Sequence, residues 1–127
     1  MSHYHALVWI DHTEAHVMHI SPDDVEKSVI HPTLPHRKLH SRKGTLGSGR
    51  APEDKDYYHA VVEALQGAQE ILIVGPAQAK LALLKHIHAH DPKTADRVVG
   101  VETVDHPTDG QLVAYARTYF LAKDRML

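Results

Sequence analysis

The chain opens with three short apolar stretches that are separated by polar turns. In the first stretch, Leu7 to Ile10 form a continuous apolar run, which predicts a strand buried on both faces. In the third, Val25 and Val29 would share one face. Turns this short join only antiparallel neighbours. We therefore predict a three-stranded antiparallel meander, with strands over residues 4–11, 14–20 and 25–31.

The remainder of the chain alternates between helical and strand patterns. Pro52 occupies the favoured first position of a helix that ends near Gly67. The apolar run 71–74 has the pattern of a buried central strand. Gly75 and Pro76 then form a turn into a second helix, which Asp91 and Pro92 end. The predicted buried stripe of that second helix consists of Leu81, Leu84 and Ile87.

A further strand and helix complete the predicted order. Residues 98–104 read as a strand. Thr108 and Gln111 have the spacing of a capping box and so mark the start of the last helix. The apolar face of that helix would consist of Leu112, Tyr115, Ala116, Tyr119 and Phe120.

These elements predict an α/β fold. The meander is followed by a long loop and then by α-β-α-β-α, so that βαβα units extend the antiparallel start. A strand–helix–strand unit makes a parallel, right-handed crossover. We therefore expect a mixed sheet with helices on its faces. The length of 127 residues suits one domain over 1–127.

The long loop, residues 32–51, differs from the rest of the chain in charge. It holds no acidic residue and has few apolar ones. Loops of this length inside a compact domain are usually functional or disordered. Lysine and arginine neutralise phosphates, and glycine lets the backbone approach them closely. We therefore predict an RNA-binding segment with these contact residues: Arg37, Lys38, Arg42, Lys43, Gly47, Ser48, Gly49 and Arg50.

The composition limits the cellular compartment and the kinds of chemical site that we expect for this chain. The chain has no cysteine, which excludes disulfides, thiolate zinc sites and cysteine nucleophiles. It shows no signal peptide, and no apolar run is long enough to span a bilayer, so we expect a cytoplasmic protein without a membrane partner. The net charge of −2 argues against strong non-specific binding to nucleic acid by the chain as a whole.

Several strings together resemble a known family. They are the opening 6–11, the glycine-rich basic loop, the strand and turn 71–76, and the segment 101–112. They are similar to small bacterial proteins labelled translational machinery proteins, which look like the central domain of archaeal and eukaryotic class I peptide release factors and of Pelota. The resemblance implies a ribonuclease-H-like topology and a ribosome or tRNA as the partner.

The resemblance also limits the chemistry that can be carried over. In the release factors, the loop before the first helix bears a Gly-Gly-Gln tripeptide that promotes peptidyl-tRNA hydrolysis. The corresponding place here reads Gly47-Ser48-Gly49, and the loop contains no glutamine. Pelota-like proteins lack the tripeptide and bind ribosomes without hydrolysing the ester. We therefore expect a non-catalytic protein that associates with the ribosome or tRNA and needs no cofactor.

A histidine-based metal-binding protein is the first alternative. The chain has 13 histidines, and His86 and His90 lie four residues apart on one face of a predicted helix. Such a pair can supply two ligands to a divalent metal. A tight site needs three or four converging ligands, and no motif of the H-E-x-x-H type occurs. Weak divalent-metal binding is the expectation.

A hydrolase acting through residues 36–50 is the second alternative. Ser41 and Ser48 lie in that loop, and His106 adjoins Asp105. The capping box and Pro107 already explain the sequence around His106 as structural. A two-metal nuclease needs several converging carboxylates, which the sparse acidic pattern does not supply.

Overall fold

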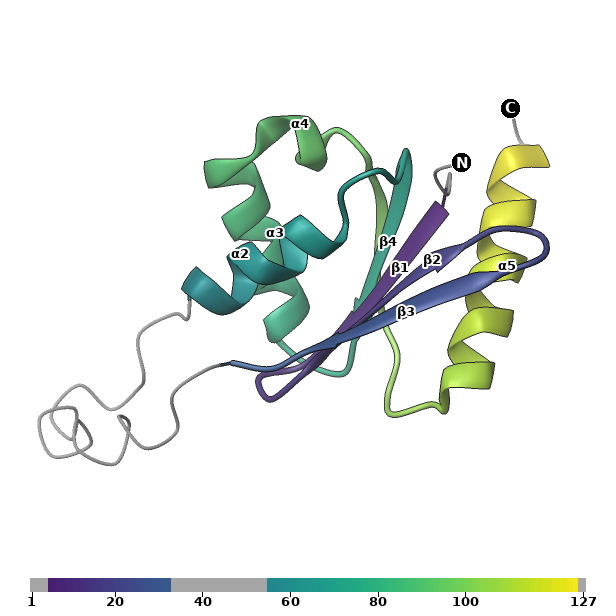
Figure 1. The fold of residues 1–127 in the computed structure, drawn as a ribbon, viewed down its shortest axis with the longest axis horizontal. Coiled ribbons are helices and arrows are strands. Elements are labelled where there is room, and N and C mark those ends of the chain that lie inside the picture. The colour runs from purple at the N-terminus through teal and green to yellow at the C-terminus, as the bar shows by residue number, and fades with distance from the viewer. Residues whose placement is uncertain (1–4, 33–54, 126–127) are drawn as a thin grey trace, which may run out of the picture.

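The computed structural model describes residues 5–32 and 55–125, and within this part a five-stranded mixed sheet has the order β3-β2-β1-β4-β5 (Figure 1). The chain pairs β1 with β2 and β2 with β3 antiparallel, and it pairs β1 with β4 and β4 with β5 parallel. This confirms the predicted α/β class and the antiparallel meander. The strands are β1 (His5–Ile10), β2 (Ala15–Ile20), β3 (Val25–Ile30), β4 (Glu70–Gly75) and β5 (Val98–Thr103).

Helices cover both faces of the sheet. In Figure 1, α2 and α3 lie on one side of the strands and α5 lies on the other. The helices are α2 (Lys55–Ala64), α3 (Ala79–His90), α4 (Pro92–Ala95) and α5 (Asp109–Arg125). None of the described helices is long and apolar enough to cross a membrane. The result is a three-layer arrangement in which the sheet contributes to a core on each side.

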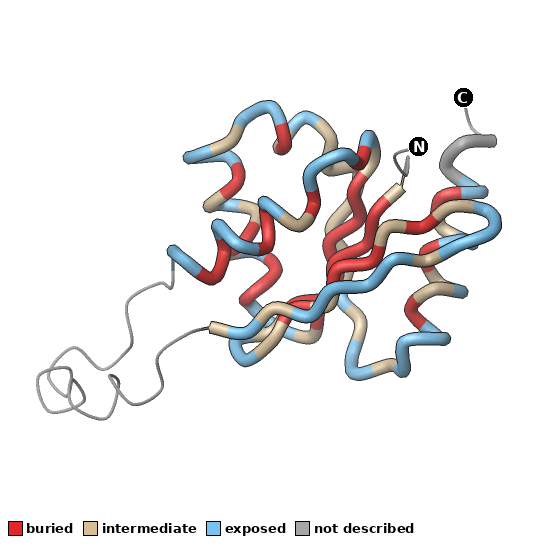
Figure 2. Tube along the Cα trace, in the orientation of Figure 1, coloured by how far each residue is buried: buried red, intermediate tan, exposed pale blue. Residues whose placement is uncertain are grey.

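The central strand β1 divides its side chains between these two cores. Val8 and Ile10 pack with α2 and α3, whereas Leu7 and Trp9 pack with α5. The run from Leu7 to Ile10 is buried throughout, as its uninterrupted apolar pattern predicted. Figure 2 shows this contrast, with the inner strands buried and β3 largely exposed. As the edge strand, β3 leaves even Val29 42% exposed.

The sequence patterns located most helix ends. Gly67 has a φ of 97°, which suits the glycine expected where α2 ends. Helix α3 ends at His90, and Asp91 and Pro92 then begin α4, a single turn that the sequence reading missed. The Asp91 side chain accepts a hydrogen bond from the Thr94 backbone N–H at 3.2 Å. The predicted start at Pro52 lies outside the described residues.

The predicted stripe of α3 was partly wrong. Ile87 is buried as predicted and Leu84 is partly buried, but Leu81 is 48% exposed, and the other buried positions are Ala79, Lys80 and Leu83. The apolar residues of α3 surround much of its circumference, so more than one stripe fitted the sequence. In α5 the predicted face was right, since Leu112, Ala116 and Phe120 are buried.

Candidate functional site

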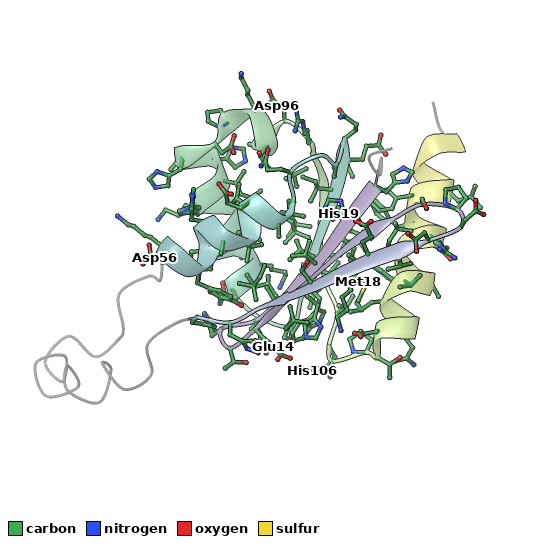
Figure 3. All side chains as sticks on the ribbon, in the orientation of Figure 1. Glu14, Met18, His19, Asp56, Asp96 and His106 are labelled. Atoms are coloured by element: carbon green, nitrogen blue, oxygen red, sulfur yellow. The ribbon has the colours of Figure 1, made fainter. Side chains whose placement is uncertain are left out.

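The carboxyl ends of the parallel strands β1, β4 and β5 meet at one edge of the sheet. Asp11 follows β1, Pro76 follows β4, and residues 104–106 follow β5. Open α/β sheets place their ligands at this kind of edge, because the loops that leave neighbouring parallel strands converge there. Figure 3 shows Glu14 and His106 at this end of the sheet and Asp96 at the opposite end. The candidate site is therefore built on this edge.

Asp11 organises the turn between β1 and β2. Its Oδ1 accepts hydrogen bonds from the Thr13 N–H at 2.8 Å, the Thr13 hydroxyl at 2.9 Å and the Glu14 N–H at 2.9 Å. Partial burial acts to raise the pKa of Asp11, but these hydrogen bonds and the nearby His106 together lower it below its ordinary value. Asp11 is therefore a fixed negative charge at the edge.

His106 links the β1 end of the edge to the segment that follows β5. Its Nδ1 lies 2.8 Å from Asp105 Oδ1, and its Nε2 lies 3.8 Å from Asp11 Oδ2. The Trp9 ring packs against the imidazole at a centroid distance of 5.2 Å, and the Trp9 Nε1–H donates to the Asp105 carbonyl at 2.7 Å. Because both imidazole nitrogens face carboxylates, His106 is placed to hold the edge together rather than to abstract a proton from a substrate.

His16 makes a second link at this edge, between β2 and the start of α5. Its Nε2 lies 3.0 Å from Glu14 Oε2 and its Nδ1 lies 3.7 Å from Asp109 Oδ1. Lys27 of β3 also pairs with Asp109. The edge thus carries acidic side chains that contact two histidines and one lysine.

The long loop over residues 32–51 is called the basic segment from here on, and described residues on either side of it lie at this same edge. His31, just after β3, has its Nδ1 3.3 Å from the Thr13 carbonyl oxygen. On the other side, the Tyr57 hydroxyl near the start of α2 donates to the Asp11 carbonyl at 2.8 Å. The described residues that flank this segment therefore both contact the turn between β1 and β2.

The predicted RNA-contact residues themselves all fall within that segment. They lie outside the described residues, and their role stays a prediction. They are Arg37, Lys38, Arg42, Lys43, Gly47, Ser48, Gly49 and Arg50.

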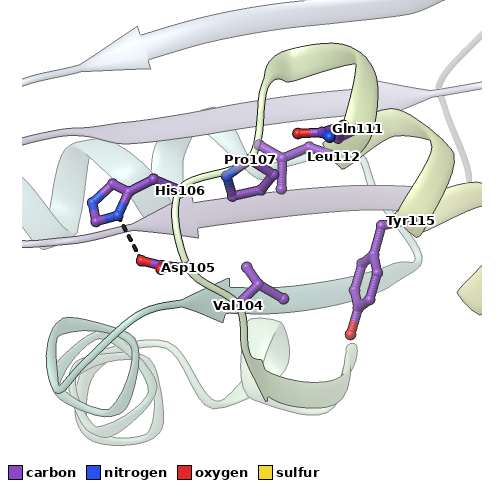
Figure 4. A pocket seen from close by; sticks show the side chains of 7 residues that line it. All are labelled: Val104, Asp105, His106, Pro107, Gln111, Leu112 and Tyr115. Carbon is purple, nitrogen blue, oxygen red and sulfur yellow. Dashed lines mark hydrogen bonds and ion pairs between the residues drawn. The ribbon is translucent and has the colours of Figure 1, made fainter.

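A pocket of about 440 Å³ opens beside this edge, between the segment after β5 and helix α5 (Figure 4). Figure 4 shows Asp105 and His106 at one end of the pocket and Tyr115 at the other. No sequence pattern predicted this pocket directly, because its residues have the pattern of a turn and a helix cap. Its lining consists of Val104, Asp105, His106, Pro107, Gln111, Leu112 and Tyr115.

The predicted metal-ligand pair lies elsewhere, on α3. The rings of His86 and His90 are 4.5 Å apart between centroids, and His86 also packs against Tyr58 at 5.8 Å. The pair is thus on one helix face, as its spacing predicted. Within residues 5–32 and 55–125, no group of three or more histidine, aspartate or glutamate side chains gathers to hold a metal ion. Metal binding by His86 and His90 stays a prediction that rests on two ligands.

Comparison with known proteins shows which solved structures have a similar fold. No family model matches the sequence, and no curated protein matches it either. Among solved structures, the chain is similar to Pelota of Thermoplasma acidophilum, with a TM-score of 0.59, 19% identity and coverage of 95% of this chain and 32% of that protein. It is also similar to the archaeal translation termination factor aRF1, with a TM-score of 0.55, 11% identity and coverage of 96% of this chain and 38% of that protein.

A third similar structure is yeast Dom34, at a TM-score of 0.52 and 12% identity, with coverage of 77% of this chain and 28% of that protein. The chain therefore spans about a third of the length of these proteins. At such low identity the likeness defines the fold alone, which is that of a release-factor-like central domain. This confirms the expected architecture, whereas membership of the bacterial family stays a prediction.

The sequence reading missed the contacts that join the edge into one unit. Trp9 was assigned only as a strand residue, although its N–H bonds to Asp105. Tyr57, at position three of the described α2, was not expected to reach Asp11. The residue types themselves could have indicated these contacts, because the indole N–H of a buried tryptophan and the O–H of a buried tyrosine each need a hydrogen-bond partner.

Proposed function

We propose that this chain binds the ribosome or tRNA without catalysing a reaction, as a counterpart of the release-factor central domain. The observation that carries the proposal is the fold likeness, which extends over 95% of the chain in the Pelota comparison and 96% in the aRF1 comparison. Dom34 is described as a translation termination-like factor involved in RNA quality control and interacting with Hbs1. A shared fold does not by itself transfer that activity, so the basic segment supplies the second support.

The charge of the basic segment suits a phosphate backbone. Five lysines and arginines occur between residues 32 and 51 without any acidic residue. Elsewhere the same edge is acidic, with Asp11, Asp105 and Asp109 on its described residues. RNA would therefore be attracted most strongly to the basic segment. Repulsion between the RNA phosphates and the acidic side chains of the edge would keep the RNA backbone away from the sheet.

Two features favour binding over catalysis. The segment that corresponds to the release-factor tripeptide contains no glutamine. At the edge of the sheet, the two ring nitrogens of His106 both face carboxylates. A general base needs a nitrogen that can reach a substrate proton. We therefore expect no release of peptide from peptidyl-tRNA when the chain is added to loaded ribosomes.

Paired charge reversals test the binding proposal. Changing Arg42 and Lys43 to glutamate alters the basic segment, and changing the exposed Lys85 and Lys93 to glutamate makes the same net-charge change on α3 and α4. With labelled tRNA and with purified ribosomes, we expect the first pair to weaken binding by about tenfold or more, because phosphate contacts are lost. The second pair should leave affinity within about threefold, since only long-range attraction changes.

Comparison of the two pairs also defines the results that would contradict the binding proposal. Equal weakening by both pairs would show that total charge governs the interaction and that the basic segment has no special part in it. Unchanged affinity in both variants would reject the segment as the binding site.

A further inference from the structure

We propose that the pocket between β5 and α5 binds an arginine side chain from a basic peptide of a partner protein. The pocket is distinct from the basic segment, so this inference goes beyond RNA association and adds a protein-binding surface. Much of its lining is apolar, including the side chains of Val104 and Leu112 and the ring of Tyr115 (Figure 4). A space of about 440 Å³ accommodates one long side chain together with part of its backbone.

The rim of the pocket presents a carboxylate in a fixed position. The Asp105 side chain is 92% exposed, and its Oδ1 accepts a hydrogen bond from His106 Nδ1 at 2.8 Å. The Asp105 backbone is held as well, because its carbonyl accepts from the Trp9 indole N–H at 2.7 Å. A carboxylate that is already oriented loses less conformational freedom when a cation binds to it.

The surrounding charge favours a cation over a phosphate. Tyr115, at the end opposite Asp105, donates its hydroxyl hydrogen to the Glu102 carboxylate, which brings a second negative group close to the pocket. Among the described residues that line the pocket there is no lysine or arginine. A phosphate placed here would meet carboxylates, with no lysine or arginine among the described lining residues to oppose them. A guanidinium group would meet complementary charge.

Arginine fits this lining better than lysine. The guanidinium is planar and can pair with a carboxylate through two N–H groups, which the ammonium group of lysine cannot do. Asp105 supplies the carboxylate, and Tyr115, at the other end of the pocket, supplies contact area for a neighbouring side chain of the peptide. Gln111 has its Oε1 occupied by the Thr108 N–H at 2.8 Å, which leaves its amide nitrogen to donate to a carbonyl of the bound peptide.

A pair of short peptides provides the test. The probes are acetyl-Leu-Arg-Leu-amide and the same peptide with citrulline, which has nearly the same shape and no charge. Each is titrated into the full chain while backbone amide signals are followed by NMR. We expect the arginine peptide to shift the signals of residues 102–115 in a saturable way. We expect the citrulline peptide to bind less tightly, and added salt to weaken only the arginine peptide.

Two variants locate the interaction. Asp105→Asn keeps the shape of the rim and should weaken binding of the arginine peptide by about two- to fivefold, the range of an ion pair at the surface. Asp96→Asn removes an exposed carboxylate at the opposite end of the sheet (Figure 3) and should leave the affinity unchanged.

Several results would overturn the inference. They are the absence of shifts over residues 102–115 with the arginine peptide, equal affinity for the citrulline peptide, and unchanged affinity in Asp105→Asn. Occupation of the same residues by a uridine oligonucleotide in preference to the arginine peptide would assign the pocket to RNA instead. A failure of ribosome binding would leave this inference standing, because the peptide titration uses no ribosome.

Discussion

Gly75 lets β4 approach β1 closely at the carboxyl edge. A Cβ atom at this position would overlap the carbonyl oxygen of Ile10, which belongs to the backbone and has little freedom to move. The Gly75 carbonyl also accepts the Val104 N–H at 3.1 Å, which continues the pairing with β5. The absence of a side chain at Gly75 thus allows three strand ends to meet at the candidate site.

This close approach gives a stability prediction. Gly75→Ala should lower the free energy of unfolding by about 1–3 kcal/mol, or more if the strands separate, because overpacking strains the backbone. Gly110→Ala is the matched control, since nothing lies within 4 Å of a Cβ there. In helix α5 the control should be neutral or stabilising by up to about 1 kcal/mol. Urea denaturation of both variants measures this, and similar losses in the two would contradict the account.

Asp11 gives a prediction about pH. Its folded-state pKa is lowered, so the stability that its charge contributes is fully present above the unfolded-state pKa, near ~4, and is lost as the pH falls through the folded-state pKa. Asp11→Asn retains an oxygen that can accept the turn hydrogen bonds but removes the charge that faces His106. The difference in unfolding free energy between wild type and Asp11→Asn should therefore shrink in acid.

Urea titrations at neutral pH and at about pH 3 measure that difference. A difference that is the same at both values would show that the Asp11 charge makes no contribution to folding.

Single residues also show which contacts could be predicted from the sequence and which could not. The pattern around Thr108 was enough to identify a helix cap, because both partners are close in sequence. The contact between Trp9 and Asp105 spans most of the chain, and no local pattern specifies it. Residues whose role depends on a distant partner became visible only once the strands were placed in order.

At the scale of the element, the start of α5 was predicted in detail. The Thr108 N–H donates to Gln111 Oε1 at 2.8 Å, and the Gln111 N–H donates to Thr108 Oγ1 at 3.1 Å, which together form the expected capping box. This start matters for the site because it places Leu112 and Tyr115 along the pocket.

Removal of the cap tests its contribution. Thr108→Ala should lower the free energy of unfolding by about 1 kcal/mol, the usual cost of losing an N-cap side chain. Thr118→Ala changes the same residue type at an exposed position within α5 and should alter stability by less than about 0.5 kcal/mol. Thermal or chemical denaturation compares the two, and an equal effect would mean that the cap is not a stabilising feature.

Strands were easier to predict than helix faces. A strand has only two faces, so the run from Leu7 to Ile10 could be assigned to both cores directly. Helix α3 has apolar residues around much of its circumference, and the choice between Leu81 and Leu83 depended on the position of the sheet. The single turn α4 is too short to produce a period, although Asp91 and Pro92 carried its cap signal.

At the scale of the whole molecule, the sheet order follows from burial. A strand that is apolar on both faces must lie inside the sheet, which places β1 between β2 and β4. The parallel pairing then brings Asp11 and the segment after β5 to one edge, where His31 and Tyr57, which flank the basic segment, also make contacts. The fold could thus be predicted in outline, whereas the pocket between β5 and α5 depended on tertiary contacts.

The most direct test of the central claim is co-sedimentation of the full chain with purified ribosomes across a salt series. It is carried out beside a variant in which Lys38, Arg42, Lys43 and Arg50 are changed to glutamate. We predict that the wild type binds at low salt and dissociates progressively as salt rises, since ions compete for the phosphates. The variant should fail to sediment at any salt concentration. Absence of wild-type binding at low salt, or sedimentation of the variant equal to that of the wild type, would contradict the account.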